Sequence, residues 1–134
     1  MTNTRQMLEA SPKPVPRELE EVAAAIDACL NCVQTCTACA DSDLIEDDVR
    51  AMRACIALCQ TCADICHVTA RVLSRPGQWD HGVMRPLLEA CIHACTACGE
   101  ECARHAEHHR HCAICAEACR TCSKACGALL DAEE

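Results

Sequence analysis

Cysteine is the residue type in this chain that is best suited to metal or redox chemistry, and its spacing is regular. The 134 residues include 17 cysteines in four blocks, and neighbours within a block are three or four positions apart. The blocks are Cys29, Cys32, Cys36 and Cys39; Cys55, Cys59, Cys62 and Cys66; Cys91, Cys95, Cys98 and Cys102; and Cys112, Cys115, Cys119, Cys122 and Cys126. Side chains at this spacing share one helix face, where apolar residues normally form the seam between packed helices. We therefore expect a bundle lined by thiols, and such a dense pattern points to metal or redox chemistry.

The rest of the composition supports cysteine as the core residue. The chain has no Phe and no Tyr, and Trp79 is its single Trp, so the bulky residues of an ordinary core are missing. A protonated buried thiol behaves as a small hydrophobe, so the core can pack before metal binds. Because the number of cysteines is odd, complete intrachain disulfide pairing is impossible.

Helix start and stop signals predict the elements that carry these cysteines. A short helix is expected within residues 1–11, followed by an extended connector that contains three prolines. Long helices are expected over about residues 16–40, 44–73 and 83–106, and a last helix, after a corner at 107–110, ends near residue 130. Asp43 and Glu46 resemble a capping box for the second long helix, and Pro86 is expected in the first turn of the third.

Short connections make consecutive helices antiparallel. The predicted fold is all-α: an up-down-up-down four-helix bundle with a cysteine-lined core and a short N-terminal helix or extension. The length fits one domain, with residues 1–15 as the extension and residues 16–131 as the metal-binding bundle. We expect the cysteines to stack in flat layers of four, the first being Cys29, Cys66, Cys91 and Cys126, with Cys112 alone beyond the last layer.

The same spacing, continued past the cysteines, predicts two different ends. At one end it reaches residues that would plug the core: Val22, Ala25, Thr69, Leu73, Met84, Leu88 and Leu129. At the other end it reaches residues with metal-binding atoms, of which we expect four to contact metal: Met52, His105, His108 and His109. Asp43 is expected to be a helix N-cap. The sequence leaves two roles open for His111: a metal contact, or only a residue of the first helical turn.

Charge favours one soft metal over the others. Soft thiolates select Cu(I), zinc or iron-sulfur clusters. Zinc bound by four thiolates carries a net charge of about −2, so several such sites in a closed core would leave many uncompensated charges. Cu(I) matched one to one with bridging thiolates is neutral. With full bridging, the capacity is roughly 15 to 20 Cu(I) ions per chain.

These blocks, together with the histidine-rich corner at residues 105–111, resemble the cytosolic copper storage proteins over residues 29–126. The resemblance implies a non-catalytic protein that stores and buffers Cu(I) inside a four-helix bundle, and it implies a homotetramer. In the exported relatives the open end of the bundle is rich in methionine, whereas here Met52 is almost the only methionine among the histidines of that end. The N-terminus has no apolar run typical of a secretory signal, which predicts a cytoplasmic protein.

Two other functions stay open as alternatives: an iron-sulfur electron carrier, and a protein that sequesters zinc or cadmium. The ferredoxin run of cysteines ending in Cys-Pro is absent, and the pairs with zinc-ribbon spacing continue in helical phase with more cysteines. The net charge is −8, with only two lysines, and no stretch is expected to reach the length of a membrane span. Nucleic acid and membranes are therefore excluded as partners, whereas copper chaperones or small thiols are expected to exchange copper with the protein.

Overall fold

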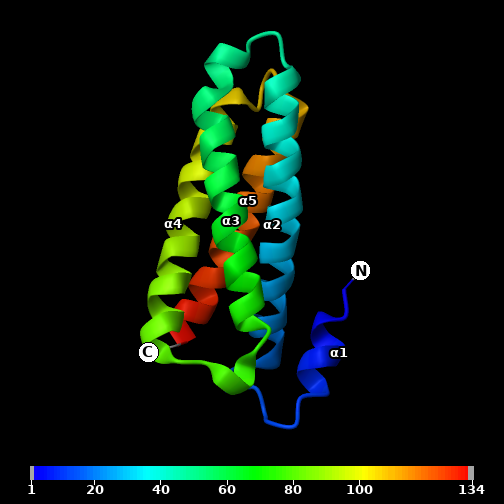
Figure 1. Cartoon of the computed structure of the whole chain (residues 1–134), viewed down its shortest axis with the longest axis vertical. Helices are drawn as coiled ribbons and strands as arrows, with labels where there is room; N and C mark the ends of the chain where they lie inside the picture. The colour runs from blue at the N-terminus through cyan, green and yellow to red at the C-terminus, as the bar shows by residue number, and fades with distance from the viewer. Residues whose placement is uncertain (1, 133–134) are drawn as a thin grey trace.

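Four long helices run antiparallel along one axis in the computed structural model, which describes residues 2–132 (Figure 1). The elements in chain order are α1 (Thr4–Glu9), α2 (Leu19–Ile45), η1 (Val49–Met52), α3 (Arg53–Leu73), η2 (Pro76–Gln78), α4 (His81–His105) and α5 (Arg110–Ala132). Each long helix packs against two neighbours, so that α2 and α4 both lie between α3 and α5. The predicted all-α, up-down-up-down bundle with a short N-terminal helix is confirmed.

The cysteines form the centre of the bundle. All 17 are buried, with at most 1% of any of them exposed. The reason is the periodicity of the sequence: positions three and four apart stay on one face of each helix, and the four cysteine faces meet along the axis. The predicted cysteine-lined core is therefore confirmed.

One end of the core is closed by apolar side chains, and we call it the apolar end. The predicted plug residues are all buried there: Val22, Ala25, Thr69, Leu73, Met84, Leu88 and Leu129. The α3–α4 connection lies at this end of the bundle, and α1 packs against α2 on the same half (Figure 1). Trp79, in that connection, donates a hydrogen bond from Nε1 to the carbonyl oxygen of Val72 at 3.1 Å. This end therefore has the ordinary packing that the cysteine region lacks.

Two details of the helix starts differ from the prediction. The capping box at Asp43 and Glu46 is wrong, because α2 continues to Ile45 and α3 begins only at Arg53. Asp43 lies in the last turns of α2, fully buried, since it is four residues beyond Cys39 and keeps the cysteine spacing. Pro86 lies in the second turn of α4 rather than the first, because α4 begins at His81 with the Asp80 carboxylate capping the Gly82 N–H at 2.7 Å.

Two segments are long and apolar enough to span a membrane by length and composition alone, namely α2 and Val49–Leu73. The expectation that no stretch reaches this length is therefore wrong. About half of the α2 window (50%) and 39% of the other are buried inside the bundle. The apolar faces of both helices carry the cysteines and pack into the common core, as in an amphipathic bundle helix.

Candidate metal centre

The thiols form one continuous array rather than separate clusters. Sulfur atoms from different helices approach within 3.6–4.0 Å of one another along the core; Cys32 and Cys62 (3.8 Å), Cys59 and Cys115 (3.8 Å), and Cys66 and Cys95 (3.6 Å) are examples. Two metal–sulfur bonds of about 2.3 Å that meet at an open angle span a similar distance. Neighbouring thiolates are thus placed to share one ion.

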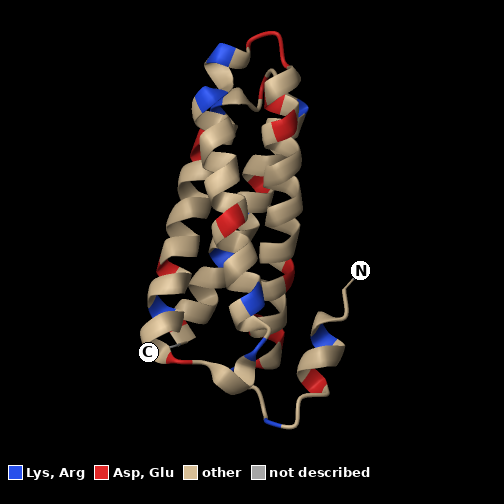
Figure 2. Ribbon diagram, viewed as in Figure 1, with Lys and Arg blue, Asp and Glu red and all other residues tan. Residues whose placement is uncertain are grey.

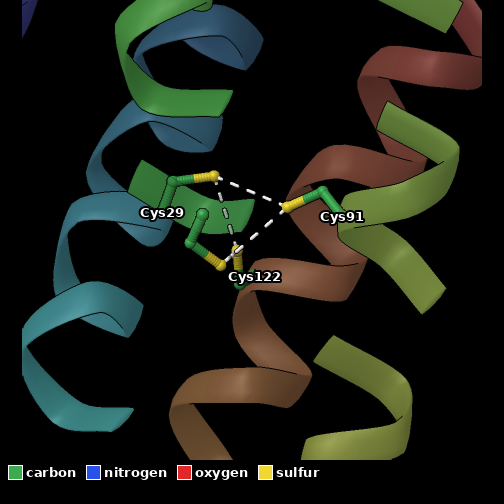
Figure 3. A group of neighbouring side chains, drawn as sticks. Cys29, Cys91 and Cys122 are labelled. Atoms are coloured by element: carbon green, nitrogen blue, oxygen red, sulfur yellow. Dashed lines mark hydrogen bonds between the residues drawn. The ribbon is translucent and has the colours of Figure 1, made fainter. Parts of the chain in front are cut away.

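Figure 3 shows three thiols of this array turned toward one another from three helices. The Sγ of Cys29 in α2 lies 4.0 Å from that of Cys91 in α4 and 3.6 Å from that of Cys122 in α5. With Cys66 of α3, these residues form a group whose sulfur atoms all lie within 4.8 Å of one another. Each helix therefore contributes one ligand to a site on the bundle axis.

The groups overlap along the axis, which corrects the predicted flat layers. Cys126 contacts Cys29 and Cys91 as predicted, at 3.8 Å each, and Cys122 joins them with its sulfur 3.6 Å from that of Cys29. Cys122 also belongs to the next group, with Cys32, Cys66 and Cys95. Further groups are Cys32, Cys36, Cys62 and Cys119; Cys36, Cys98, Cys115 and Cys119; and Cys39, Cys59, Cys102 and Cys115. Cys112 is not alone, because its sulfur lies 3.9 Å from that of Cys39. Since most groups share a member with a neighbour, an ion can move along the core by exchanging one thiolate at a time.

Cysteine spacing within one helix also produces bidentate pairs. The sulfur atoms of Cys32 and Cys36 are 3.6 Å apart, and those of Cys62 and Cys66 are 3.9 Å apart. Both pairs are separated by one helical turn, as the Cys-x-x-x-Cys spacing requires. These pairs add contacts along the axis to those across it.

The other end of the array carries polar ligand atoms, and we call it the histidine end. His111 is central there: its Nδ1 lies 3.3 Å from the Sγ of Cys39 and 3.6 Å from the Sγ of Cys112. Its Nε2 lies 2.8 Å from a carboxylate oxygen of Glu46. Asp43 completes the cluster, with Oδ1 3.7 Å from the sulfur of Cys112.

Burial and hydrogen bonding shift the pKa values of the groups at the histidine end. Burial raises the pKa of the Asp43 carboxyl to about 7, and the neighbouring thiols of Cys55 and Cys39 add to the effect. Burial opposes protonation of His111, but hydrogen bonds to Cys39 and Glu46 outweigh it and raise the pKa of the imidazole. Burial also raises the pKa of the Cys112 thiol. The thiol and the carboxyl therefore hold protons that a metal ion has to displace.

The four other residues expected to contact metal lie at the same end, in different environments. Met52 is fully buried. His105 bonds to Glu101 through Nε2 at 2.9 Å, and His109 bonds to Asp48 through Nε2 at 3.1 Å and to Glu46 through Nδ1 at 2.9 Å. His108 is exposed, on the outer side of the corner. The structure thus brings Met52, His105 and His109 to the histidine end and leaves His108 turned to solvent.

Acidic residues surround these histidines. Figure 2 shows acidic residues in the α2–η1 turn, at the end of the bundle away from the N-terminus. Glu46 is shared by His109 and His111, and Glu101 binds both His105 and Arg104. The sequence reading overlooked Glu46 and Glu101 as partners of histidines and placed Asp43 as a cap. The signal for Asp43 was its position four residues after Cys39.

A family model for copper storage proteins matches residues 18–131, nearly the whole bundle. This chain belongs to the copper storage protein family. The family resemblance drawn from the cysteine blocks is confirmed, and so is the non-catalytic function, since the family stores copper rather than transforming a substrate. In this copper storage protein, thiolates of the core bind multiple copper ions, with histidines near one end.

Solved structures of relatives share this architecture. The copper storage protein Ccsp from Streptomyces lividans, loaded with 10 copper equivalents, is 46% identical and superposes with a TM-score of 0.93, covering 96% of this chain and 98% of that one. A five-copper structure of the cytosolic copper storage protein from the same organism is 52% identical, with a TM-score of 0.82 and coverage of 84% and 93%. The cysteine-rich protein YhjQ of Bacillus subtilis (strain 168) is 36% identical over 106 residues, which are 79% of this chain and 93% of the relative.

Proposed function

We propose that residues 16–131 form a cytoplasmic store that holds on the order of one Cu(I) per cysteine, roughly 15 to 20 ions per chain. The observation that carries the proposal is the continuity of the array: all 17 thiols are buried, and neighbouring sulfur atoms are 3.6–4.0 Å apart along its length. A chain of bridging thiolates and Cu(I) ions is neutral, so filling the core does not accumulate buried charge. The cytoplasmic location is supported by the relative from Streptomyces lividans, which is described as cytosolic.

Copper enters at the histidine end in this proposal, because the apolar end is closed by buried side chains. The proposed ligands are the 17 cysteines, with Met52, His105, His108 and His109 as contacts for arriving copper. The positions of His111 and Asp43, both beside Cys112, support adding them to this route. An ion taken up there passes inward by exchange between overlapping thiol groups.

Release follows the same exchange chemistry in reverse. A copper chaperone or a small thiol that offers two thiolates can take an ion from the outermost groups without unfolding the bundle. The family resemblance supports a homotetramer.

The test is an anaerobic titration of reduced, metal-free protein with Cu(I). Thiolate-to-copper absorption is followed in the near ultraviolet, where the absence of Tyr and the single Trp leave little background. Bound copper is counted after desalting, and proton release is followed with a pH indicator. We expect uptake to continue to about one copper per cysteine, with about one proton released per thiol that becomes a ligand.

Saturation near four metal ions would contradict the proposal, because it would indicate discrete sites. Stronger binding of zinc, or formation of an iron-sulfur chromophore, would support the corresponding alternatives instead. Circular dichroism of the metal-free protein is the control for folding. We expect it to be largely helical, since protonated thiols pack as apolar groups before copper replaces their protons.

A further inference from the structure

Four side chains at the histidine end form a mixed set of donors that differs from the all-sulfur core. These are Cys39 and Asp43 on α2 and His111 and Cys112 on α5. The distances are 3.3 Å from His111 Nδ1 to the Cys39 sulfur, 3.6 Å to the Cys112 sulfur and 3.7 Å to Asp43 Oδ1. The Cys112 sulfur lies 3.9 Å from that of Cys39 and 3.7 Å from Asp43 Oδ1.

These separations match five of the six edges of a small tetrahedron. Zinc binds sulfur at about 2.3 Å and imidazole nitrogen or carboxylate oxygen at about 2.0–2.2 Å, so adjacent ligand atoms in a tetrahedral site are about 3.3–3.8 Å apart. The five measured distances lie within about 0.1 Å of that range. Little rearrangement is needed for an ion to sit at the centre.

Asp43 supplies an independent sign of a missing positive partner. The residue is fully buried, and its second carboxylate oxygen, Oδ2, has no hydrogen-bond partner within the described part of the chain. A buried carboxylate oxygen without a partner costs free energy that a bound cation recovers. The carboxylate is held beside two thiols, where it contributes nothing to apolar packing.

The imidazole of His111 is oriented as a metal ligand usually is. Its Nε2 lies 2.8 Å from Glu46, so a neutral ring with its hydrogen on Nε2 donates to the carboxylate and presents the Nδ1 lone pair to the thiols. Glu46 in turn accepts from His109, whose other nitrogen pairs with Asp48. This carboxylate–histidine chain fixes the ring in the way that hydrogen-bond partners of metal-bound histidines do at zinc sites.

We infer that Cys39, Asp43, His111 and Cys112 bind a single zinc ion that closes the copper entrance. Nitrogen and oxygen donors suit borderline Zn²⁺ better than soft Cu(I), which selects sulfur. With two thiolates, one carboxylate and a neutral imidazole, the site has a net charge of about −1, compared with about −2 for zinc on four core thiolates. Binding releases one proton from each of the two thiols, and the buried Asp43 carboxyl gives up any proton that it holds.

A bound zinc ion occupies the two thiols nearest to the entrance. The closing role rests on the proposed uptake of copper at this end, whereas the zinc site itself stands on the geometry of the four ligands. Copper then has to displace zinc, or wait for it to leave, before it reaches Cys59, Cys102 and Cys115, which form a group with Cys39. Zinc thereby sets the rate of copper loading without changing the capacity of the deeper core.

The first experiment adds one equivalent of Zn²⁺ to reduced, metal-free protein and measures the zinc X-ray absorption edge. A ligand shell of two sulfur and two nitrogen or oxygen atoms is expected. Asp43→Asn and His111→Ala should each weaken zinc binding by at least about tenfold in competition with a chromophoric chelator. The matched controls are Asp64→Asn and His93→Ala, which change the same residue types at exposed positions on α3 and α4. They should bind zinc like the unchanged chain.

A shell of four sulfur atoms, or equal zinc affinity in Asp43→Asn and in the unchanged chain, would overturn the site. The second experiment compares the rate of Cu(I) uptake with and without one equivalent of zinc. Zinc should slow uptake in the unchanged chain and in both control variants, and have a smaller effect in Asp43→Asn. Equal rates with and without zinc would overturn the closing role. The final copper content, measured in the same samples, tests the storage proposal separately, because it does not depend on the zinc site.

Discussion

The Nδ1 of His111 lies 3.3 Å from the sulfur of Cys39, although 72 residues separate them in the chain. The contact joins the start of α5 to the end of α2 and places an imidazole directly on the outermost thiols. Because Nε2 bonds to Glu46, Nδ1 faces the array rather than solvent. This imidazole therefore supplies a nitrogen donor in direct contact with the thiols of Cys39 and Cys112.

The first prediction concerns the rate of copper uptake. His111→Ala should slow Cu(I) uptake several-fold and leave the final copper content within about one ion of that of the unchanged chain, because all 17 thiols remain. The measurement is stopped-flow absorption after mixing with Cu(I), followed by metal counting. His93→Ala, at an exposed position of α4, is the control. If His111→Ala and His93→Ala load at the same rate, His111 has no part in the entrance.

The second prediction concerns pH and Asp43. Burial raises the pKa of its carboxyl to about 7 in the folded protein, above the value of about 4 expected in the unfolded chain. The folded state thus binds this proton more tightly, so its contribution to stability is fully present below about pH 4 and is lost as the pH rises through about 7. The metal-free protein should therefore lose stability between pH 5 and pH 7.5.

Urea unfolding of the reduced, metal-free protein at these two pH values measures this loss. In Asp43→Asn the loss should be smaller, because the amide does not titrate. Asp64→Asn, at an exposed position, should behave like the unchanged chain. An equal loss in Asp43→Asn and in the unchanged chain would assign the pH dependence to other groups, such as His111.

Much of this fold could be predicted from the spacing of the cysteines, because a 3–4 repeat buries one face only when the segment is helical. The apolar end could be predicted equally well, since Leu73 and Leu88 continue the same repeat. Asp43 shows where sequence reasoning fails: an acidic residue before a predicted helix fits an N-cap, and it also fits the next position of the cysteine repeat. Only the path of the chain after Ile45 decides between the two.

The contacts between helices were the least predictable part. Flat layers assume that antiparallel helices lie at equal heights, but the axial offset between α2 and α5 depends on packing and on connections whose lengths the sequence defines poorly. The offset brings Cys122 as well as Cys126 into contact with Cys29. It also brings His111 to Cys39, a pairing that no local pattern of residues indicates.

The third prediction concerns the apolar end. Leu88 is fully buried, and Leu44 is 57% exposed, so the pair tests the same substitution in two environments. Leu88→Ala should lower the free energy of unfolding of the metal-free protein by about 2–5 kcal/mol, because it leaves a cavity in the apolar packing of that end. Leu44→Ala should change it by about 0.5 kcal/mol or less. Urea unfolding followed by circular dichroism gives both values, and similar losses in the two variants would mean that the apolar end does not anchor the empty bundle.

The fourth prediction concerns the approach of α4 to α5. A Cβ atom at Gly99 would lie 3.2 Å from the Cβ of Cys119, whereas a Cβ at Gly127 would meet nothing within 4 Å. Replacing glycine by alanine inside a helix normally stabilises it by about 0.5–1 kcal/mol. Gly127→Ala should show this gain in full. Gly99→Ala should be less stable than Gly127→Ala by about 1 kcal/mol or more, because its methyl group presses on the neighbouring helix at a thiol of the array.

The same pair of variants tests whether close helix packing sets the spacing of the thiols. Gly99→Ala should alter the near-ultraviolet absorption that develops as Cu(I) fills the core, since Cys119 belongs to two of the overlapping groups. Gly127→Ala, which leaves the α4–α5 contact unchanged, should give the original spectrum. If both variants gain equal stability and load copper with identical spectra, the contact between Gly99 and Cys119 adjusts freely, and the thiol spacing does not depend on it.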